Sequence, residues 1–408
     1  MSLIKPFRGL RPAAHHATDV AAPPYDVLNS EEARLRAAGR PWSFLHISKP
    51  EIDLAPNIDP YAAEVYAKAV DNLKRMIDAG ILQRDSRDSY YAYQIQMGDH
   101  VQTGFVAVAS VAAYDAGRIK KHEFTRPDKE DDRVRQIEAL NAQTGPVLLA
   151  YPASPAADAL LAQAESGAPI ADVLADDGIR HKIWQVADET LIADITAAFE
   201  RMHALYIADG HHRSAAASRI AAARRHGGRE QSSDYFLAVI FPHHQMRIMD
   251  YNRVVKDLNG LSGDEFLARL ASCYAVSPAS GAVKPACPGE VGLYLPGRWY
   301  RLNINPRLFV ADPVARLDVS LLSAHVLGPI LGITDLRRDK RIDFVGGIRG
   351  LGELERRVDS GEMAAAFAMY PTRLDDLMAV ADAGQVMPPK STWFEPKLAD
   401  GLVSHVID

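Results

Sequence analysis

The sequence Asp209-Gly210-His211-His212-Arg213 joins a short apolar stretch to a predicted helix. The N–H groups of a helix N-terminus carry the positive end of the helix dipole, and a glycine lets the backbone approach a ligand closely. An arginine in the first turn can form a fork of hydrogen bonds to a phosphate. The pattern therefore predicts a phosphate site, although an aspartate cap beside two exposed histidines is the more common use of such a turn.

A second candidate is the pair His122-Glu123, which precedes a strongly charged helical segment. A solvated helix face accounts for most of the charges in that segment. The pair itself comes before the helix, at the end of a predicted strand, where side chains are displayed rather than buried. A carboxylate in such a position can serve as a general base.

The third candidate is Lys390-Ser391-Thr392, near the C-terminal end of the sequence. A lysine followed by two hydroxyls can bind a phosphate or a carboxylate. Prolines precede it, however, in place of the glycines of a phosphate-binding P-loop. A surface loop stiffened by proline is therefore an equal alternative.

Composition limits the function classes that these residues could serve. The 408 residues include 46 Lys and Arg against 52 Asp and Glu, a net charge of −6, which argues against a nucleic-acid-binding protein. With 48% hydrophobic and 24% charged residues, the chain has the composition of a globular protein. Two cysteines exclude a disulfide framework, no apolar run could span a membrane, and the expected compartment is the cytoplasm.

Strand and helix patterns are mixed along the chain. Apolar periodicity predicts an amphipathic helix over 59–80 and a helix over 126–142 that Thr125 would cap. Aromatic and β-branched residues predict strands over 90–97, 103–112, 205–208 and 235–241. Thr372 is expected to cap a last helix that ends near residue 384. This mixture predicts an α/β fold of the mixed α+β kind.

Six segments carry a resemblance that extends over almost the whole chain. They are Phe7 to Pro12, Ala22 to Val27, Ser43 to His46, Arg126 to Arg133, Asp209 to Arg213 and Pro389 to Phe394. In these segments the chain resembles a bacterial family catalogued as domain of unknown function 1015. The family name specifies no reaction.

Three motifs are also similar, in type and order, to those of the free serine kinases of archaea, which belong to the sulfiredoxin and partition-protein-B superfamily. These motifs are His122-Glu123, Asp209 to Arg213 and Pro389 to Thr392. The resemblance implies a nucleotide-binding core of that superfamily with an N-terminal extension. His211 stands where sulfiredoxins have their catalytic cysteine, so repair of sulfinic acid is not expected.

The resemblance and the chemistry together predict a nucleotide-dependent kinase that phosphorylates free L-serine or a related hydroxyl compound. Its cofactors would be ADP or ATP, with Mg²⁺. Glu123 is the expected general base, and Asp209 is a second catalytic carboxylate and a candidate Mg²⁺ ligand. The expected nucleotide-phosphate ligands are Gly210, His211, His212 and Arg213, and the expected substrate ligands are His122, Lys390, Ser391 and Thr392.

Two alternatives remain open at this point. One is a nucleotide-binding regulatory protein without catalysis, and the other is a phosphatase that hydrolyses phosphoserine. No nucleic-acid or membrane partner is expected, and a homo-oligomer is left open. The expected domains are an N-terminal α/β extension over 1–115, a core over 116–275 with an insertion at 148–200, and a C-terminal α/β lobe over 290–408.

Overall fold

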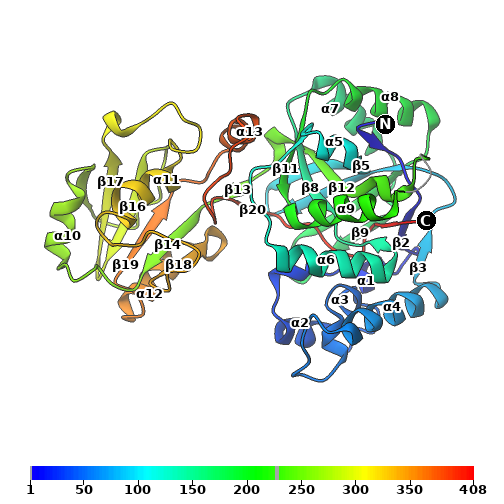
Figure 1. The fold of residues 1–408 in the computed structure, drawn as a ribbon, viewed down its shortest axis with the longest axis horizontal. Helices are drawn as coiled ribbons and strands as arrows, with labels where there is room; N and C mark the ends of the chain where they lie inside the picture. Colours follow the sequence, from blue (N-terminus) through cyan, green and yellow to red (C-terminus); the bar gives the residue numbers. More distant parts are fainter. Residues whose placement is uncertain (1, 226–228) are drawn as a thin grey trace. The chain divides into compact units, whose positions relative to one another are not determined.

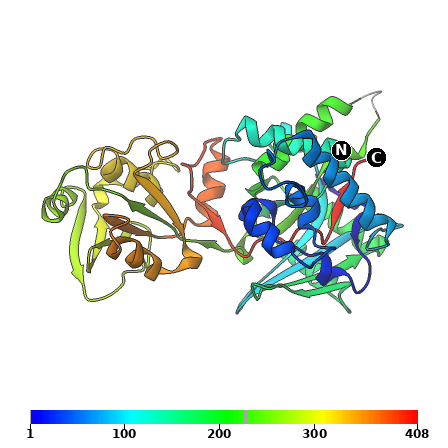
Figure 2. The same ribbon diagram turned by 90° about the horizontal axis from the view of Figure 1, so that it is seen from below.

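The structure is a computed structural model that describes residues 2–225 and 229–408. The chain divides into two compact units. Unit 1 contains residues 1–246 and 396–408, and unit 2 contains residues 247–395. The final segment therefore returns to the unit in which the chain begins, as the red ribbon shows in both Figure 1 and Figure 2.

Unit 1 is built on a nine-stranded mixed sheet. Its strand order is β6-β11-β8-β12-β5-β4-β10-β9, and β1 pairs with the end of β5. The bounds are β1 Ile4–Lys5, β4 Tyr90–Met97, β5 His100–Ser110, β6 Ile119–Lys120, β8 Val147–Tyr151, β9 Ala171–Leu174, β10 Arg180–Val186, β11 Leu205–Asp209 and β12 Tyr235–Pro242. Every residue of β12 is buried, as expected for an apolar strand that is covered on both faces.

Nine α-helices are described in unit 1. Their bounds are α1 Ala17–Val20, α2 Ser30–Ala37, α3 Leu45–Ser48, α4 Ala63–Asp78, α5 Val111–Asp115, α6 Pro127–Leu140, α7 Pro155–Ala164, α8 Glu189–Glu200 and α9 His211–Arg224. Buried residues of α7, α8 and α9 join those of the strands in one hydrophobic core. Helix α6 packs beside α9, as Figure 1 shows. Proline at the first position of α6 and a left-handed Asn141 after its end set the limits of that helix.

A second, four-stranded sheet of unit 1 joins the two ends of the chain. Its order is β3-β2-β21-β7, and all its pairings are antiparallel. The bounds are β2 Gly9–Pro12, β3 Leu82–Arg84, β7 Ala142–Gln143 and β21 Ser404–Val406. The C-terminal residues are thus held between segments from the first half of the sequence.

Unit 2 contains a six-stranded antiparallel sheet in the order β15-β17-β16-β19-β14-β18, and the pair β13-β20. The strand bounds are β13 Ile248–Met249, β14 Tyr251–Val255, β15 Tyr274–Ala279, β16 Glu290–Leu295, β17 Arg298–Ile304, β18 Ile342–Gly346, β19 Ala365–Met369 and β20 Trp393–Phe394. Its helices are α10 Gly263–Leu270, α11 Asp318–Leu322, α12 Leu351–Asp359 and α13 Leu374–Asp382.

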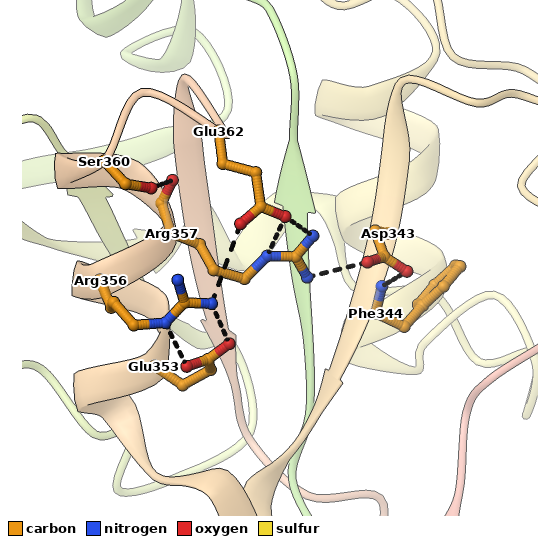
Figure 3. A network of polar contacts seen from close by, with 7 residues as sticks. All are labelled: Asp343, Phe344, Glu353, Arg356, Arg357, Ser360 and Glu362. Carbon is orange, nitrogen blue, oxygen red and sulfur yellow. Dashed lines mark hydrogen bonds and ion pairs between the residues drawn. The ribbon is translucent and has the colours of Figure 1, made fainter. Parts of the chain in front are cut away.

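An ion pair joins α12 to the sheet of unit 2, and further pairs lie within the helix and just after it (Figure 3). The guanidinium of Arg357 lies 2.8 Å from Asp343 of β18 and 2.5 Å from Glu362, while Arg356 pairs with Glu353 at 2.7 Å. Most of these side chains are partly exposed, so each pair contributes little to stability by itself. The buried face of the helix, Leu354 and Val358, packs on the sheet.

The mixed α/β fold class is confirmed. The predicted helices at 59–80 and 126–142 correspond to α4 and α6, and the strand predicted at 90–97 is β4. Two predicted caps are wrong, because neither α6 nor α13 has a side-chain cap. The Thr125 hydroxyl donates to Glu130, and the Thr372 hydroxyl donates to the carbonyl of Ser391.

The boundaries of the two units differ from those of the expected domains. Residues 1–115 supply β4 and β5 to the middle of the nine-stranded sheet, and the segment 148–200 supplies β9 and β10 to its edge. Sequence periodicity indicates strands but not their pairing partners, so these segments look separate in the sequence. Among the described residues, no helix combines the length and apolar character needed to cross a membrane.

Gly104 provides a test of the packing in this sheet. A Cβ at this position would lie 2.6 Å from the carbonyl oxygen of Ile240 and 2.9 Å from the ring of Phe241. Gly104→Ala should lower the free energy of unfolding by about 1–3 kcal/mol, the usual cost of overpacking. Urea denaturation measures this, and Gly263→Ala, whose added Cβ would have its nearest neighbour at 3.8 Å, is the control. Equal stability of Gly104→Ala and wild type would contradict the close packing of β5 on β12.

Candidate functional site

The site is organised by the turn between β11 and α9. Buried residues Leu205 to Ala208 lead to Asp209, and α9 begins two residues later at His211. Gly210 has a φ of 98°, and a Cβ there would lie 3.3 Å from the Cα of Val147. A glycine is therefore required for both the left-handed backbone and the close approach. No side chain caps α9, so its first turn presents N–H groups to a ligand.

His122 and Glu123 reach this turn because β6 runs parallel to β11. Ile119 pairs with Leu205 and Lys120 with Tyr206, so the two strands end at the same edge of the sheet. The backbone N–H of His122 donates to Nε2 of His211 at 3.4 Å, and the two rings are nearly perpendicular. Oε2 of Glu123 lies 3.8 Å from Nδ1 of His211. Residues 89 positions apart in the sequence thus meet at the start of α9.

Both histidines are neutral at neutral pH. Burial lowers the pKa of His122 to about 4. Burial also lowers the pKa of His211 well below its ordinary value, and the neighbouring His122 lowers it further. Each ring therefore offers one lone pair and one N–H group.

Asp209 is an ionised carboxylate with two cationic neighbours. Its Oδ1 accepts a hydrogen bond from the N–H of Gly210 at 2.8 Å. Its Oδ2 lies 3.6 Å from Nζ of Lys397 and 3.7 Å from Nη2 of Arg213. Burial alone would raise the pKa of Asp209, but the charges of Lys397 and Arg213 hold it well below its usual range. The side chain is 37% exposed, so it remains accessible to a ligand.

Arg213 lies inside the protein rather than at its surface. Its side chain is 10% exposed, and its Nη1 donates to the carbonyl of Pro146. Its Nη2 lies 3.9 Å from Oδ2 of Asp26, in addition to its contact with Asp209. The guanidinium therefore connects three chain segments, and its positive charge lies next to the turn between β11 and α9.

A small cavity of about 30 Å³ adjoins this guanidinium. Tyr25, Arg133, Gly145, Arg213 and Asp400 are among its lining residues. Its volume suits water and excludes a nucleotide. The guanidinium of Arg133 stacks over the ring of Tyr25 at 3.9 Å, and burial raises the pKa of Asp400 to about 7.

His212 and the C-terminal motif have other surroundings. Nε2 of His212 accepts a hydrogen bond from the backbone N–H of Arg126 at 3.0 Å, which ties α9 to the start of α6. Lys390, Ser391 and Thr392 belong to unit 2. There the carbonyl of Lys390 accepts from Arg253, and the hydroxyl of Ser391 donates to the carbonyl of Pro388 at 2.6 Å. Their part in substrate binding stays a prediction.

The structure thus brings His122, Glu123, Asp209 and His211 together at the start of α9, and Arg213 is buried next to Asp209. Neither Lys397 nor Asp400 is among the predicted site residues. No spacing rule connects either residue to Asp209, because the chain returns to unit 1 only after Glu395.

The family profile described as "Protein of unknown function (DUF1015)" matches residues 4–320. The chain belongs to this family. No curated protein matches it.

Several solved structures are similar to this DUF1015 chain at low identity. A free serine kinase in complex with AMP is 14% identical, and the match covers 73% of this chain and 92% of that chain with a TM-score of 0.37. A mutant free serine kinase in complex with ADP has the same identity and coverage and a TM-score of 0.36. SbnI with a C-terminal truncation, from Staphylococcus aureus, is 11% identical, with coverage of 73% and 86% and a TM-score of 0.38. At these values, the function of the DUF1015 chain has to be argued from the geometry of its own site.

Arg213 is expected to contribute strongly to stability. Arg213→Ala leaves Asp26 and Asp209 without their shared cation and the Pro146 carbonyl without its donor. Because both carboxylates are partly exposed, the loss should be about 2–3 kcal/mol, below the roughly 3–5 kcal/mol of fully buried pairs. Urea denaturation tests this. The control is Arg219→Ala on the same helix, whose exposed pair with Asp131 should contribute under about 1 kcal/mol. Equal losses in the two variants would contradict the central role of Arg213.

Asp400 is expected to make stability depend on pH. Its pKa is about 7 in the folded protein, against about 3.9 in an unfolded chain, so the folded state binds this proton more tightly. The resulting stabilisation is complete below about pH 4 and is lost as the pH rises to about 7. The free energy of unfolding of wild type relative to Asp400→Asn should therefore fall over this range. A difference that stays constant from pH 4 to 8 in urea titrations would show that Asp400 does not titrate in this way.

Proposed function

We propose that this DUF1015 protein transfers a phosphoryl group from ADP or ATP to the hydroxyl of a small molecule, with free L-serine as the first candidate acceptor. The observation that carries the proposal is that the uncapped N-terminus of α9 has a carboxylate on each side of it: Glu123 lies 3.8 Å from the ring of His211, and Asp209 precedes the turn. The order of the three motifs, which is similar to that of free serine kinases, supports the same choice.

The start of α9 fits the phosphates of a nucleotide. Gly210 leaves the backbone of the turn open to close approach, and the N–H groups of the first turn offer hydrogen bonds. Because the guanidinium of Arg213 is engaged inside the protein, it supports the turn electrostatically, and the backbone of residues 210–213 makes the direct contacts. Mg²⁺ would arrive with the nucleotide and neutralise phosphate charge.

The two carboxylates would have different tasks. Glu123 is 50% exposed on an irregular segment, so a substrate hydroxyl can reach it. It would accept the hydroxyl proton as the hydroxyl oxygen forms its bond to phosphorus and the nucleotide leaves. Asp209 is fixed by Gly210 and Lys397, and it would orient the acceptor by accepting a hydrogen bond. Two cationic neighbours already compensate its charge, so it fits this task better than that of a Mg²⁺ ligand.

Two other functions make different predictions for the same site. A nucleotide-binding regulator would bind ADP or ATP at α9 without forming a phosphorylated product. A phosphatase would release inorganic phosphate from phosphoserine in the absence of nucleotide. Incubation of the full chain with Mg²⁺, either nucleotide and a panel of hydroxyl amino acids, followed by mass spectrometry, separates the three.

Glu123→Gln tests the role of the general base. The change keeps the shape of the side chain and removes the proton acceptor, so turnover should fall by about 10²–10⁴-fold while nucleotide affinity stays the same. Glu138→Gln makes the same change at an exposed position of α6 and should leave both unchanged. Steady-state kinetics and calorimetric titration measure the two quantities. Wild-type turnover in Glu123→Gln would exclude Glu123 as the base.

A further inference from the structure

His122 has a lone pair that nothing in the described part of the chain uses. The side chain is 2% exposed, and its Nδ1 is buried without a hydrogen-bond partner among the described residues. A hydrogen bond to the backbone of Ile207 engages the ring, and by elimination Nε2 is the nitrogen that makes it. A backbone carbonyl that accepts from Nε2 leaves Nδ1 as a bare acceptor. Buried polar atoms of this kind are rare in native structures and call for an explanation.

Glu123 and His211 lie in one cluster with His122. His122, Glu123 and His211 each offer one ligand atom, and these atoms lie within 4.8 Å of one another. From the sequence, His122-Glu123 and His211 looked like members of separate motifs. The fold makes them one cluster of two imidazoles and one carboxylate.

We propose that His122, Glu123 and His211 bind a transition-metal ion of the zinc class. Two imidazoles and one carboxylate are ligands that Zn²⁺ accepts, whereas Mg²⁺ prefers an all-oxygen set. Three protein ligands leave a fourth position for water or a substrate oxygen, as in catalytic zinc sites. The hydrogen bond from the ring of His122 to Ile207 is the outer contact that usually orients a histidine ligand.

Metal binding requires the three ligand atoms to move slightly closer together. Ligand atoms around a tetrahedral zinc ion lie about 3.3–3.6 Å apart, as metal–ligand lengths near 2.0–2.2 Å imply. Nδ1 of His211 and Oε2 of Glu123 are already 3.8 Å apart, and Glu123 is half-exposed on an irregular segment, so it can close the rest. Binding through Nδ1 moves the proton of His211 to Nε2 and ends the hydrogen bond from the N–H of His122. That bond is 3.4 Å long, so its loss costs little.

The metal site does not rest on the phosphoryl transfer proposed above, but both proposals use Glu123. A carboxylate lone pair given to a metal ion is not available to a proton, so ion binding and base catalysis are alternative uses of Glu123. The metal is therefore tested on the full chain without nucleotide or acceptor.

Cobalt titration tests the site directly. The chain is freed of metal with a chelator, and Co²⁺ is added while the visible absorption is recorded. Wild type should bind one Co²⁺ with the absorption of a four- or five-coordinate ion, and Zn²⁺ should displace it. His122→Ala and Glu123→Gln should each weaken Co²⁺ binding by at least about 100-fold, the upper end of the loss caused by removing an outer hydrogen-bond partner.

His16→Ala is the matched control, because His16 also lies beside a carboxylate, at 3.1 Å from Asp19, but on the surface. It should bind Co²⁺ as wild type does. Glu123→Gln decides the test if His122→Ala fails to fold, since Glu123 is exposed. Wild-type affinity in Glu123→Gln, or no Co²⁺ binding at all, overturns the inference. Cobalt binding that depends on these residues supports it even where no phosphoryl transfer is detected, and phosphoryl transfer without cobalt binding overturns the metal site alone.

Discussion

The site depends on one buried guanidinium. Arg213 contacts Asp26 from the N-terminal region, Pro146 just before β8, and Asp209 at the end of β11. These segments come from distant parts of the sequence, and one guanidinium contacts all three, through Nη1 to the Pro146 carbonyl and through Nη2 to the two carboxylates. The turn at Gly210 and the start of α9 lie directly beside this guanidinium. The arginine expected to bind phosphate therefore also has structural partners inside the protein.

The sequence predicts the local elements of the site well and its assembly poorly. The strand before Asp209, the glycine turn and α9 follow from periodicity and residue type, and all three are present. The approach of His122-Glu123 to this turn depends on the parallel pairing of β6 with β11. That pairing is a choice among many partners, and no local pattern specifies it. The motif resemblance placed Glu123 and Asp209 in one site, whereas periodicity alone could not.

The contacts of Lys397 and Asp400 cannot be predicted from the sequence. Both act at the turn because the chain leaves unit 1 after Met246, forms unit 2, and returns at Pro396. Lys397 then neutralises Asp209, and Asp400 is buried beside Arg213 and Arg133. The charge of Lys397, near the C-terminal end, thus lowers the pKa of Asp209 near the middle of the chain. The spacing of residues along the sequence does not indicate this contact.

The two carboxylates of the site, Asp209 and Glu123, have different surroundings. Asp209 has Lys397 and Arg213 within 4 Å, so its lone pairs are held by fixed cations and its basicity is low. Glu123 has a neutral imidazole at 3.8 Å and a side chain half in solvent. The lone pairs of Asp209 are therefore less available to a proton or a metal ion that enters the site. The general-base role and the metal-ligand role are both proposed for Glu123, whose side chain is half exposed, and the two uses exclude each other at a single carboxylate.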